Sequence, residues 1–351
     1  MNTGRKDWWT DDPKLRMLFS VAGASGIRGL SSYFFAPKLL LGAEGLKMLQ
    51  GSVPSLSRRK SVLIITDQTV RKLAEKVQKA LVEGGCRVEI WDGVVPEPPV
   101  ENVFAGAEAA GRCAADVVVA VGGGSVIDAA KAVCLVYARP DLDIRQVKPV
   151  DPDTLSVVPL GIKAKVLLAA VPTTSGTGSQ NTQTTVFTHR GVKSGCSSEY
   201  IRPALSIVDP ELTFSLSKEV TRNSGYDALM HSIESFLARP FREVKERPIL
   251  YQGGNAFSRP LALEAFRSIW SSYREAVAHG QNREARWHMS LGSHLAGLAF
   301  SHSGLGLVHA LASSLGGMID APHGVCLAAC TVIGLGYNLD RKSTRLNSSH
   351  M

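Results

Sequence analysis

The sequence predicts a two-domain protein in which an α/β domain with a mostly parallel sheet is followed by an all-α domain. Up to about residue 212, short apolar strands alternate with amphipathic helical segments, a pattern typical of parallel sheets covered by helices. Beyond that point the strand pattern stops, and long stretches with helical periodicity follow. We therefore assign residues 35–212 to the α/β domain and residues 213–338 to the helical domain. Residues 1–34 form an N-terminal extension without a clear period.

The individual elements follow from apolar runs that are separated by turn residues. In the first domain we expect a strand, a turn and a helix after Phe35, and further strands at 62–67, 87–92, 116–121, 166–171 and 204–208. Helices are expected near 69–84, near 100–113 and from Ser125 onward. In the second domain, apolar residues at helical spacing predict long helices near 217–238, 260–279 and 283–300.

Composition narrows the class of protein. The chain has 351 residues, which is enough for two hydrophobic cores, and no apolar run reaches the ~20 residues of a membrane span. The polar, acid-containing N-terminus is not a secretory signal, and six cysteines without a Cys-x-x-Cys pair fit a reducing compartment. The net charge of +8 comes without a basic run that would indicate nucleic-acid binding. We expect a cytoplasmic protein that has neither a membrane nor a nucleic-acid partner.

One carboxylate and one imidazole at helical spacing predict half of a metal site. Asp227 and His231 are four positions apart in a predicted helix, so they lie on one face and can bind one cation together. Asn223 or Ser224 is the expected cap at the start of this helix. A single histidine on an apolar helix is more often a hydrogen-bonded core residue than a ligand, so the prediction depends on further partners.

His309 and His323 supply these partners. On one continuous helix, fourteen positions at roughly 1.5 Å each would separate them by about 21 Å, too far for a shared ion. Gly316-Gly317 and Pro322 lie between them and predict a break that turns the chain back. One carboxylate and three imidazoles suit Fe(II), or alternatively Zn(II), better than Mg or Ca.

A glycine-rich turn predicts a nucleotide site in the first domain. A strand ends in three glycines and a helix begins directly after them, with the candidate residues Gly122, Gly123, Gly124, Ser125, Asp128 and Lys131. Glycines let the backbone approach a pyrophosphate, and the free N–H groups of a helix N-terminus attract its charge. The alternative is a turn that is glycine-rich only for steric reasons. Asp67, at the end of an earlier strand, would accept hydrogen bonds from an adenosine ribose and repel a 2′-phosphate.

Several motifs together resemble the iron-containing (group III) alcohol dehydrogenase family. They are Gly225-x-Asp227-Ala-Leu-x-His231-x-x-Glu234, Ala296-Gly-Leu-Ala-Phe300, Gly306-Leu-Val-His309-Ala-Leu-Ala and Pro322-His323-Gly324. The resemblance implies a Rossmann-like dinucleotide-binding domain, a helical metal-binding domain, and Asp227, His231, His309 and His323 as ligands of Fe2+. It also implies NAD as the cofactor, a small alcohol or aldehyde as the substrate, and a homodimer.

The same resemblance extends to the cofactor site. The family shares the Gly-Gly-Gly-Ser-x-x-Asp-x-x-Lys stretch, where it contacts the dinucleotide phosphates. The loop at 172–179 is a second match, and it adds Thr173, Thr174 and Thr177 as polar contacts to the cofactor. Lys193 matches a lysine near the cofactor ribose. An acid at the position of Asp67 goes with a preference for NAD over NADP in this family.

Three positions depart from the family pattern. Many members carry a histidine for proton exchange four residues after the ligand that corresponds to His309, whereas this chain has Ser313. His302, a chain of water molecules or the cofactor ribose would then take over proton transfer, so His309, Ser313 and His302 are the catalytic candidates. A usual glutamate is replaced by Gln180, and a common asparagine by Glu97.

Two further interpretations remain at this stage. A lyase with a dehydroquinate synthase-like fold would also use NAD and a metal, although the ligand spacing resembles the dehydrogenases. A non-catalytic nucleotide-binding fragment is the other, because residues 339–351 are polar, lack a period and resemble a non-native tail on a truncated chain. Truncation would leave apolar residues such as Leu327, Val332 and Ile333 uncovered.

Overall fold

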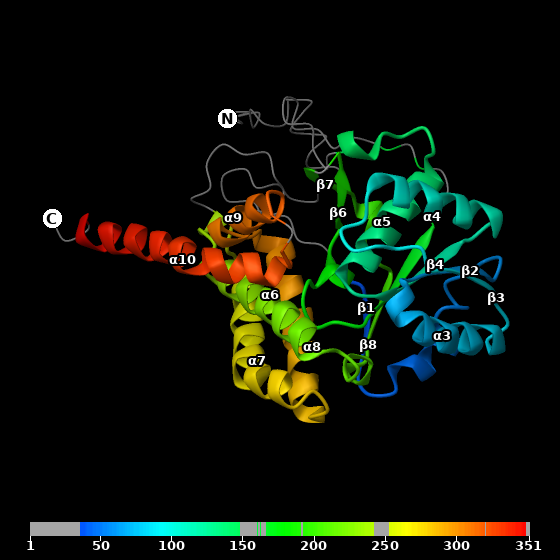
Figure 1. Ribbon diagram of the computed structural model, residues 1–351, viewed down its shortest axis with the longest axis horizontal. Helices are drawn as coiled ribbons and strands as arrows, with labels where there is room; N and C mark the ends of the chain where they lie inside the picture. Colours follow the sequence, from blue (N-terminus) through cyan, green and yellow to red (C-terminus); the bar gives the residue numbers. More distant parts are fainter. Residues whose placement is uncertain are drawn as a thin grey trace, which may run out of the picture.

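The computed structural model describes residues 36–147, 160, 162, 166–190, 192–241, 253–319 and 321–348. The predicted N-terminal extension at residues 1–34 lies outside these ranges. Figure 1 shows an α/β part, which contains the large sheet, beside a group of helices from the second half of the chain. This arrangement confirms the predicted order of an α/β region followed by a helical one.

The sheet of the first domain has six strands, and all its neighbouring pairs are parallel. Its strands are β1 (Lys38–Leu41), β2 (Ser61–Ile65), β3 (Arg87–Trp91), β4 (Val117–Gly122), β5 (Leu167–Pro172) and β8 (Leu205–Val208). They lie in the order β1-β8-β5-β4-β2-β3. The chain leaves β2 toward one edge and β4 toward the other, so the crevice at their carboxyl ends is a topological switch point where ligands commonly bind.

Both faces of the sheet are covered, which explains why the strands are almost continuously apolar. On β4, Val118 and Ala120 belong to the core beneath α4 (Val100–Arg112) and α5 (Gly124–Ala138). Their neighbours Val117, Val119 and Val121 belong to the core on the other face, with α2 (Leu49–Ser52) and α3 (Arg71–Glu83). Short 3-10 helices are η1 (Gly45–Met48), η2 (Gln68–Val70), η3 (Ile144–Gln146), η4 (Ser179–Asn181), η5 (Glu199–Ile201) and η6 (Pro210–Thr213).

An antiparallel hairpin of β6 (Thr184–His189) and β7 (Val192–Ser197) was not predicted. Its strands are rich in Thr, Ser and Gly, so they lack the apolar run that marked the other strands. Asp128 on α5 fixes the hairpin, because its carbonyl oxygen accepts from Thr185 Oγ1 at 2.6 Å and its carboxylate from Val186 N at 3.1 Å. The hairpin thereby becomes a wall beside the helix that follows the glycine turn.

Five helices form the second domain: α6 (Lys218–Leu237), α7 (Ser258–Ala278), α8 (Arg283–Ser303), α9 (Leu307–Gly316) and α10 (His323–Ser348). The prediction that α6 is capped at Asn223 or Ser224 is wrong. The N-cap is Ser217, six or seven residues earlier, whose hydroxyl accepts from Val220 N at 3.1 Å, and the helix begins at Lys218. Ser224 instead donates its hydroxyl to the carbonyl of Val220 at 2.7 Å, as an internal helical residue can.

The C-terminal segment also differs from expectation. Residues 339–348, predicted to lie outside the fold, continue helix α10 in the structure, whereas 349–351 lie outside the described residues. Leu327 is fully buried, so its predicted exposure is wrong, whereas Val332 and Ile333 are 81 % and 67 % exposed as expected. Within the described ranges, no single helix is long and apolar enough to cross a membrane; α8 and α9 meet that criterion only as a pair bent by 101°.

Candidate metal and cofactor site

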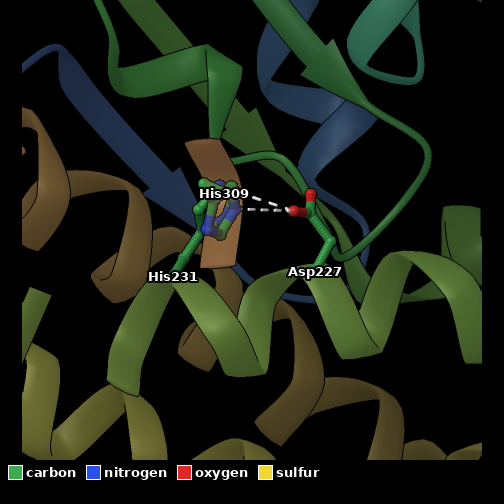
Figure 2. Close-up of side chains that lie close together, drawn as sticks. All are labelled: Asp227, His231 and His309. Carbon is green, nitrogen blue, oxygen red and sulfur yellow. Dashed lines mark hydrogen bonds and ion pairs between the residues drawn. The ribbon is translucent and has the colours of Figure 1, made fainter. Parts of the chain in front are cut away.

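Asp227, His231 and His309 form a buried cluster in the helical domain. Asp227 and His231 lie one turn apart on α6, and His309 reaches them from the first turn of α9 (Figure 2). The Nε2 atoms of His231 and His309 lie 3.5 and 3.4 Å from Asp227 Oδ1. The two imidazole rings stack with their centroids 4.5 Å apart, and Phe300 stacks on His231 at 4.4 Å.

His323 completes this group from the start of α10. Its Nε2 atom lies 3.8 Å from Asp227 Oδ1, and its side chain is 36 % exposed, so it faces the open side of the cluster. The chain reverses between α9 and α10, as the glycines and Pro322 predicted. The structure therefore brings the four predicted ligands together.

The spacing of these atoms fits a divalent ion. The three nitrogen-to-oxygen distances exceed the 2.7–3.2 Å of ordinary N–H···O hydrogen bonds. Bonds of about 2.1 Å to a tetrahedral ion would place neighbouring ligand atoms about 3.4 Å apart. One ligand atom each from Asp227, His231 and His309 lies within 4.8 Å of the other two. Nitrogen and carboxylate donors in this number suit Fe(II) or Zn(II).

The pKa shifts in the cluster leave most of its side chains without the proton that would block metal binding. Burial opposes the charge on Asp227, but His231, His309 and His323 together hold its pKa at about 2. Burial lowers the pKa of His231 to about 3 and also lowers that of His323. For His309 burial acts the same way, but Asp227 and Glu234 raise its pKa to about 9. Three of the four groups are thus in the protonation state that binds a metal at neutral pH.

Glu234 is a functional residue whose role sequence reasoning missed. Its carboxylate accepts from Val308 N at 2.7 Å, from His309 N at 3.2 Å and from Nδ1 of the His309 ring. Gly306 makes this approach feasible, because a Cβ there would lie 2.7 Å from Glu234 Oε1. The available signal was spacing: Glu234 lies seven positions after Asp227 and three after His231, on the same helix face.

A cavity of about 590 Å³ joins this cluster to the first domain. Residues of both domains line it, including Gly124, Ser125, Asp128, Thr177, Lys193, Asp227, His231, Phe300, His309, Ser313 and His323. One cavity is therefore lined by the predicted phosphate-binding turn, by Lys193 and by the metal ligands. Ser313, which occupies the position of the expected proton-transfer histidine, also faces this cavity.

The turn at Gly122, Gly123 and Gly124 packs too closely against its neighbours to hold larger side chains. A Cβ at Gly122 would lie 2.5 Å from the side chain of Val126, and one at Gly124 would lie 2.5 Å from Thr177. Any larger residue would separate the turn from its own helix or from the neighbouring loop. Gly123 is the N-cap of α5, so the first free N–H groups of this helix lie beside Gly124 and Ser125 at the cavity. This arrangement suits an anionic phosphate.

The surroundings of Lys131 indicate that this side chain stabilises the fold. Its ammonium is fully buried and donates to Ser179 Oγ, Thr182 Oγ1 and Thr184 O at 2.7, 2.7 and 2.8 Å, which uses all three of its hydrogens. Asp128 Oδ1 lies 3.8 Å from the same nitrogen. Burial lowers the pKa of Lys131 to about 8 and raises that of Asp128, and their mutual attraction opposes both shifts. The pair holds η4 and β6 in place around the cavity.

Four other predicted residues are not among those that line the cavity: Asp67, Thr173, Thr174 and His302. Thr173 is buried and donates its N–H to Gly122 O at 3.0 Å, and Thr174 packs behind Gly123. Asp67 follows β2 at the same sheet edge as the glycine turn, and its carboxylate caps η2. His302 is buried, and its Nδ1 contacts Leu298 O at 2.8 Å; it does not line the cavity.

Comparison with known proteins gives consistent matches. Residues 36–210 match the model of the family described as iron-containing alcohol dehydrogenase, and residues 221–350 match its C-terminal domain. The chain is 35 % identical over 272 residues to the mitochondrial hydroxyacid-oxoacid transhydrogenase of Xenopus laevis, covering 74 % of this chain and 58 % of that protein. It is 31 % identical to the NAD-dependent methanol dehydrogenase of Bacillus methanolicus, covering 90 % and 78 %. The solved structure of a 1,3-propanediol oxidoreductase is similar at 32 % identity and a TM-score of 0.75, covering 84 % of this chain and 73 % of that one.

The family matches also test the prediction about residues 339–351. The C-terminal family model continues to residue 350, so the expectation that residues 339–351 have no match in the family is wrong for residues 339–350. The chain spans a little over half the length of the transhydrogenase that it resembles. The two family models together cover most of the sequence, and the gap between them, from residue 210 to residue 221, spans η6 and the start of α6. With its fold, its ligand cluster and both of these matches, the chain belongs to the iron-containing alcohol dehydrogenase family.

Proposed function

We propose that the protein is an NAD-dependent, Fe2+-requiring alcohol dehydrogenase that also works as an aldehyde reductase on small substrates. One observation carries this proposal: a single cavity has the N-terminus of α5 in its wall together with Asp227, His231, His309 and His323. A dinucleotide whose phosphates bind at the helix would extend toward the metal ligands. The NAD-dependent methanol dehydrogenase among the relatives supports the same choice of cofactor.

The residues of the cavity divide the chemistry between them. A bound Fe2+ would supply a Lewis acid for an alcohol or carbonyl oxygen, and NAD would supply or accept the hydride. Gly124 and Ser125 would hold the cofactor phosphates, and Phe300 and Ala310 give the wall near the cluster an apolar character that limits water. Ser313, which occupies the position of the family's proton-transfer histidine, is the hydroxyl that we expect to pass a proton between the substrate and solvent.

Asp67 supports NAD over NADP. Its carboxylate stands at the carboxyl end of β2, next to the strand that ends in the glycine turn. An acid at this edge accepts hydrogen bonds from ribose hydroxyls and repels a 2′-phosphate. We extend the proposal to a cytoplasmic homodimer; sedimentation of the purified chain would test the dimer, and fractionation of cells would test the location.

The test is an assay of the reconstituted protein. Anaerobic loading with Fe(II), followed by NADH absorbance with short alcohols, diols and hydroxy acids, should show turnover that a chelator abolishes. A protein that holds stoichiometric Fe(II) and NADH but oxidises none of these would contradict the dehydrogenase. The transhydrogenase relative favours a second candidate, in which the hydride passes between a hydroxy acid and an oxo acid on one bound cofactor. Turnover without net NADH formation would identify that activity, and a lyase would show neither net nor transferred hydride.

A further inference from the structure

A loop of the first domain contacts the helical domain beside the metal ligands. Within this loop, at 172–179, Thr177 lines the cavity and packs against the glycine turn, since a Cβ on Gly124 would lie 2.5 Å from its side chain. Gly176 packs on α6, because a Cβ there would lie 2.8 Å from the Cβ and 3.0 Å from the carbonyl oxygen of Ser224. The loop therefore joins the predicted phosphate-binding turn to the helix that carries two of the metal ligands.

One polar atom of a metal ligand lacks a partner at this junction. Nδ1 of His231 is buried and makes no hydrogen bond of ordinary geometry with any residue that the structure describes. A histidine that binds a metal through Nε2 carries its proton on Nδ1, and it almost always donates that proton to a carboxylate, a carbonyl group or water. His309 meets this requirement with Glu234. His231 needs an acceptor of its own.

The carbonyl group of Gly176 faces the ring of His231. Burial lowers the pKa of His231, and the backbone of Gly176 is among the groups that oppose this shift. A backbone acceptor favours the protonated ring, whereas an N–H group would disfavour it, so the carbonyl oxygen is the group that acts. A carbonyl oxygen has two lone pairs and can accept from two donors at once.

Ser293 on α8 holds this carbonyl group. Its hydroxyl donates to Gly176 O at 3.1 Å, and both residues are buried. One turn earlier on the same helix, Ser290 Oγ lies 3.0 Å from Ser175 Oγ. Two buried serines of α8 thus bind neighbouring residues of one loop, but only the contact of Ser293 involves the carbonyl group that faces the metal ligand.

We propose that Ser293 is a positioning residue for the metal site: it fixes the Gly176 carbonyl group, which accepts the Nδ1 proton of His231 when a metal is bound. This inference rests on the metal site of the proposed function, and it assigns part of the support of that site to the cofactor loop of the first domain. Without the serine hydroxyl, the carbonyl group is free to turn away from the ring. The expected result is weaker metal binding by an intact set of ligands.

The first experiment measures Zn(II) affinity by competition with a chromophoric chelator. Ser293→Ala should bind Zn(II) about tenfold more weakly than wild type, and Ser293→Cys, which keeps a weak S–H donor, should lie between the two. Ser290→Ala is the matched control, because it removes a buried hydroxyl that contacts the same loop at Ser175, and it should bind Zn(II) normally. Equal weakening in Ser290→Ala and Ser293→Ala, or none in either, overturns the proposal.

Nuclear magnetic resonance of the Zn(II)-loaded protein tests the hydrogen bond itself. His231 and His309 are buried, so the Nδ1–H group of each should give a signal that appears on Zn(II) binding and exchanges slowly with water. Glu234→Gln should shift the signal of His309, whose Nδ1 it contacts, and this identifies the other signal as that of His231. Ser293→Ala should shift the His231 signal or speed its exchange, and Ser290→Ala should do neither. A His231 signal that responds equally to both variants, or is absent from wild type, overturns the proposal.

Both measurements need no substrate, so they separate this inference from the proposed function. If wild type binds Zn(II) and Fe(II) but oxidises no alcohol, the proposed function fails, and the affinities still decide the role of Ser293. If wild type binds neither metal, the proposed function and the role of Ser293 are both wrong.

Discussion

Glu234 accepts hydrogen bonds from the ring and from the backbone of His309, so one carboxylate fixes a metal ligand in two ways. The contact at Nδ1 holds a proton of the imidazole on that atom, so Nε2, which faces Asp227, is the atom that binds a metal once its own proton is lost. The contacts to the N–H groups of Val308 and His309 also stabilise the first turn of α9. The order of α9 and the orientation of the ligand are therefore linked through Glu234.

This relationship predicts the effect of removing the carboxylate. Glu234→Ala should weaken Fe(II) or Zn(II) binding about 10–100-fold, the usual effect of losing a partner that orients a ligand. Competition with a chromophoric chelator would measure it. Glu234→Gln, which keeps an acceptor but not the charge, should lie between Ala and wild type. Glu219→Gln on the first turn of the same helix should bind metal normally. Equal affinity in Glu234→Ala and wild type would show that the carboxylate only supports α9.

His231 provides a direct test of the ligand set. His231→Ala should lose both stoichiometric metal and turnover, because its Nε2 is one of the nitrogens around Asp227. Elemental analysis of the purified protein and the NADH assay would measure the two losses. His279→Ala is the matched control, since His279 is exposed and pairs with Glu275 outside the cluster. Retention of one metal per chain in His231→Ala would contradict the assignment of this site.

Much of the fold was readable from the sequence because the sheet is covered on both sides. Such strands are runs of Val, Ile, Leu and Ala, which stand out between the polar turns, and all six predicted strands are present. The β6–β7 hairpin was not predicted because contacts with Asp128 and Lys131 hold it in place, and the local sequence pattern does not show such contacts. The helical range near 217–238 was predicted well, but the cap of α6 was placed too late because two plausible capping residues, Asn223 and Ser224, lie inside the helix.

The candidate site was predictable in its ligands but less so in its supporting contacts. Asp227 and His231 share a helix face by spacing alone, and the reversal between His309 and His323 followed from the intervening glycines and Pro322. Lys131 was expected at the cofactor from the motif, whereas burial and three hydrogen bonds give it a structural environment. Such partners come from distant parts of the chain, so spacing could not identify them.

Lys131 and Asp128 predict a coupled effect on stability. Lys131→Met should lower the free energy of unfolding of metal-free protein by about 3–5 kcal/mol, because it leaves the partly buried carboxylate of Asp128 without its cationic partner and three hydrogen-bond acceptors without their donor. Adding Asp128→Asn should recover part of this loss, which chemical denaturation would measure. Lys79→Met, at an exposed position of α3, is the control for a lost surface charge. Losses that simply add in the double variant would show that the two charges do not interact.

The cofactor preference predicts the last outcome. Replacing Asp67 should increase the use of NADP relative to NAD, because the charge that repels a 2′-phosphate is gone. The choice of replacement matters, since Asp67 also caps η2 by accepting from Thr69 N and Val70 N. Serine keeps a capping oxygen without the charge, so Asp67→Ser isolates the electrostatic effect, whereas Asp67→Gly removes both.

Steady-state kinetics with both cofactors would measure the ratio of kcat/KM for NADP to that for NAD. We expect this ratio to rise about tenfold or more in Asp67→Ser, as removal of one unfavourable charge contact predicts. Asp92→Ser is the matched control, because this acid follows the adjacent strand β3 but is already paired with Arg71 at 2.6 Å. If Asp67→Ser and Asp92→Ser leave the ratio equally unchanged, Asp67 acts only as the cap of η2, and the preference for NAD has another source.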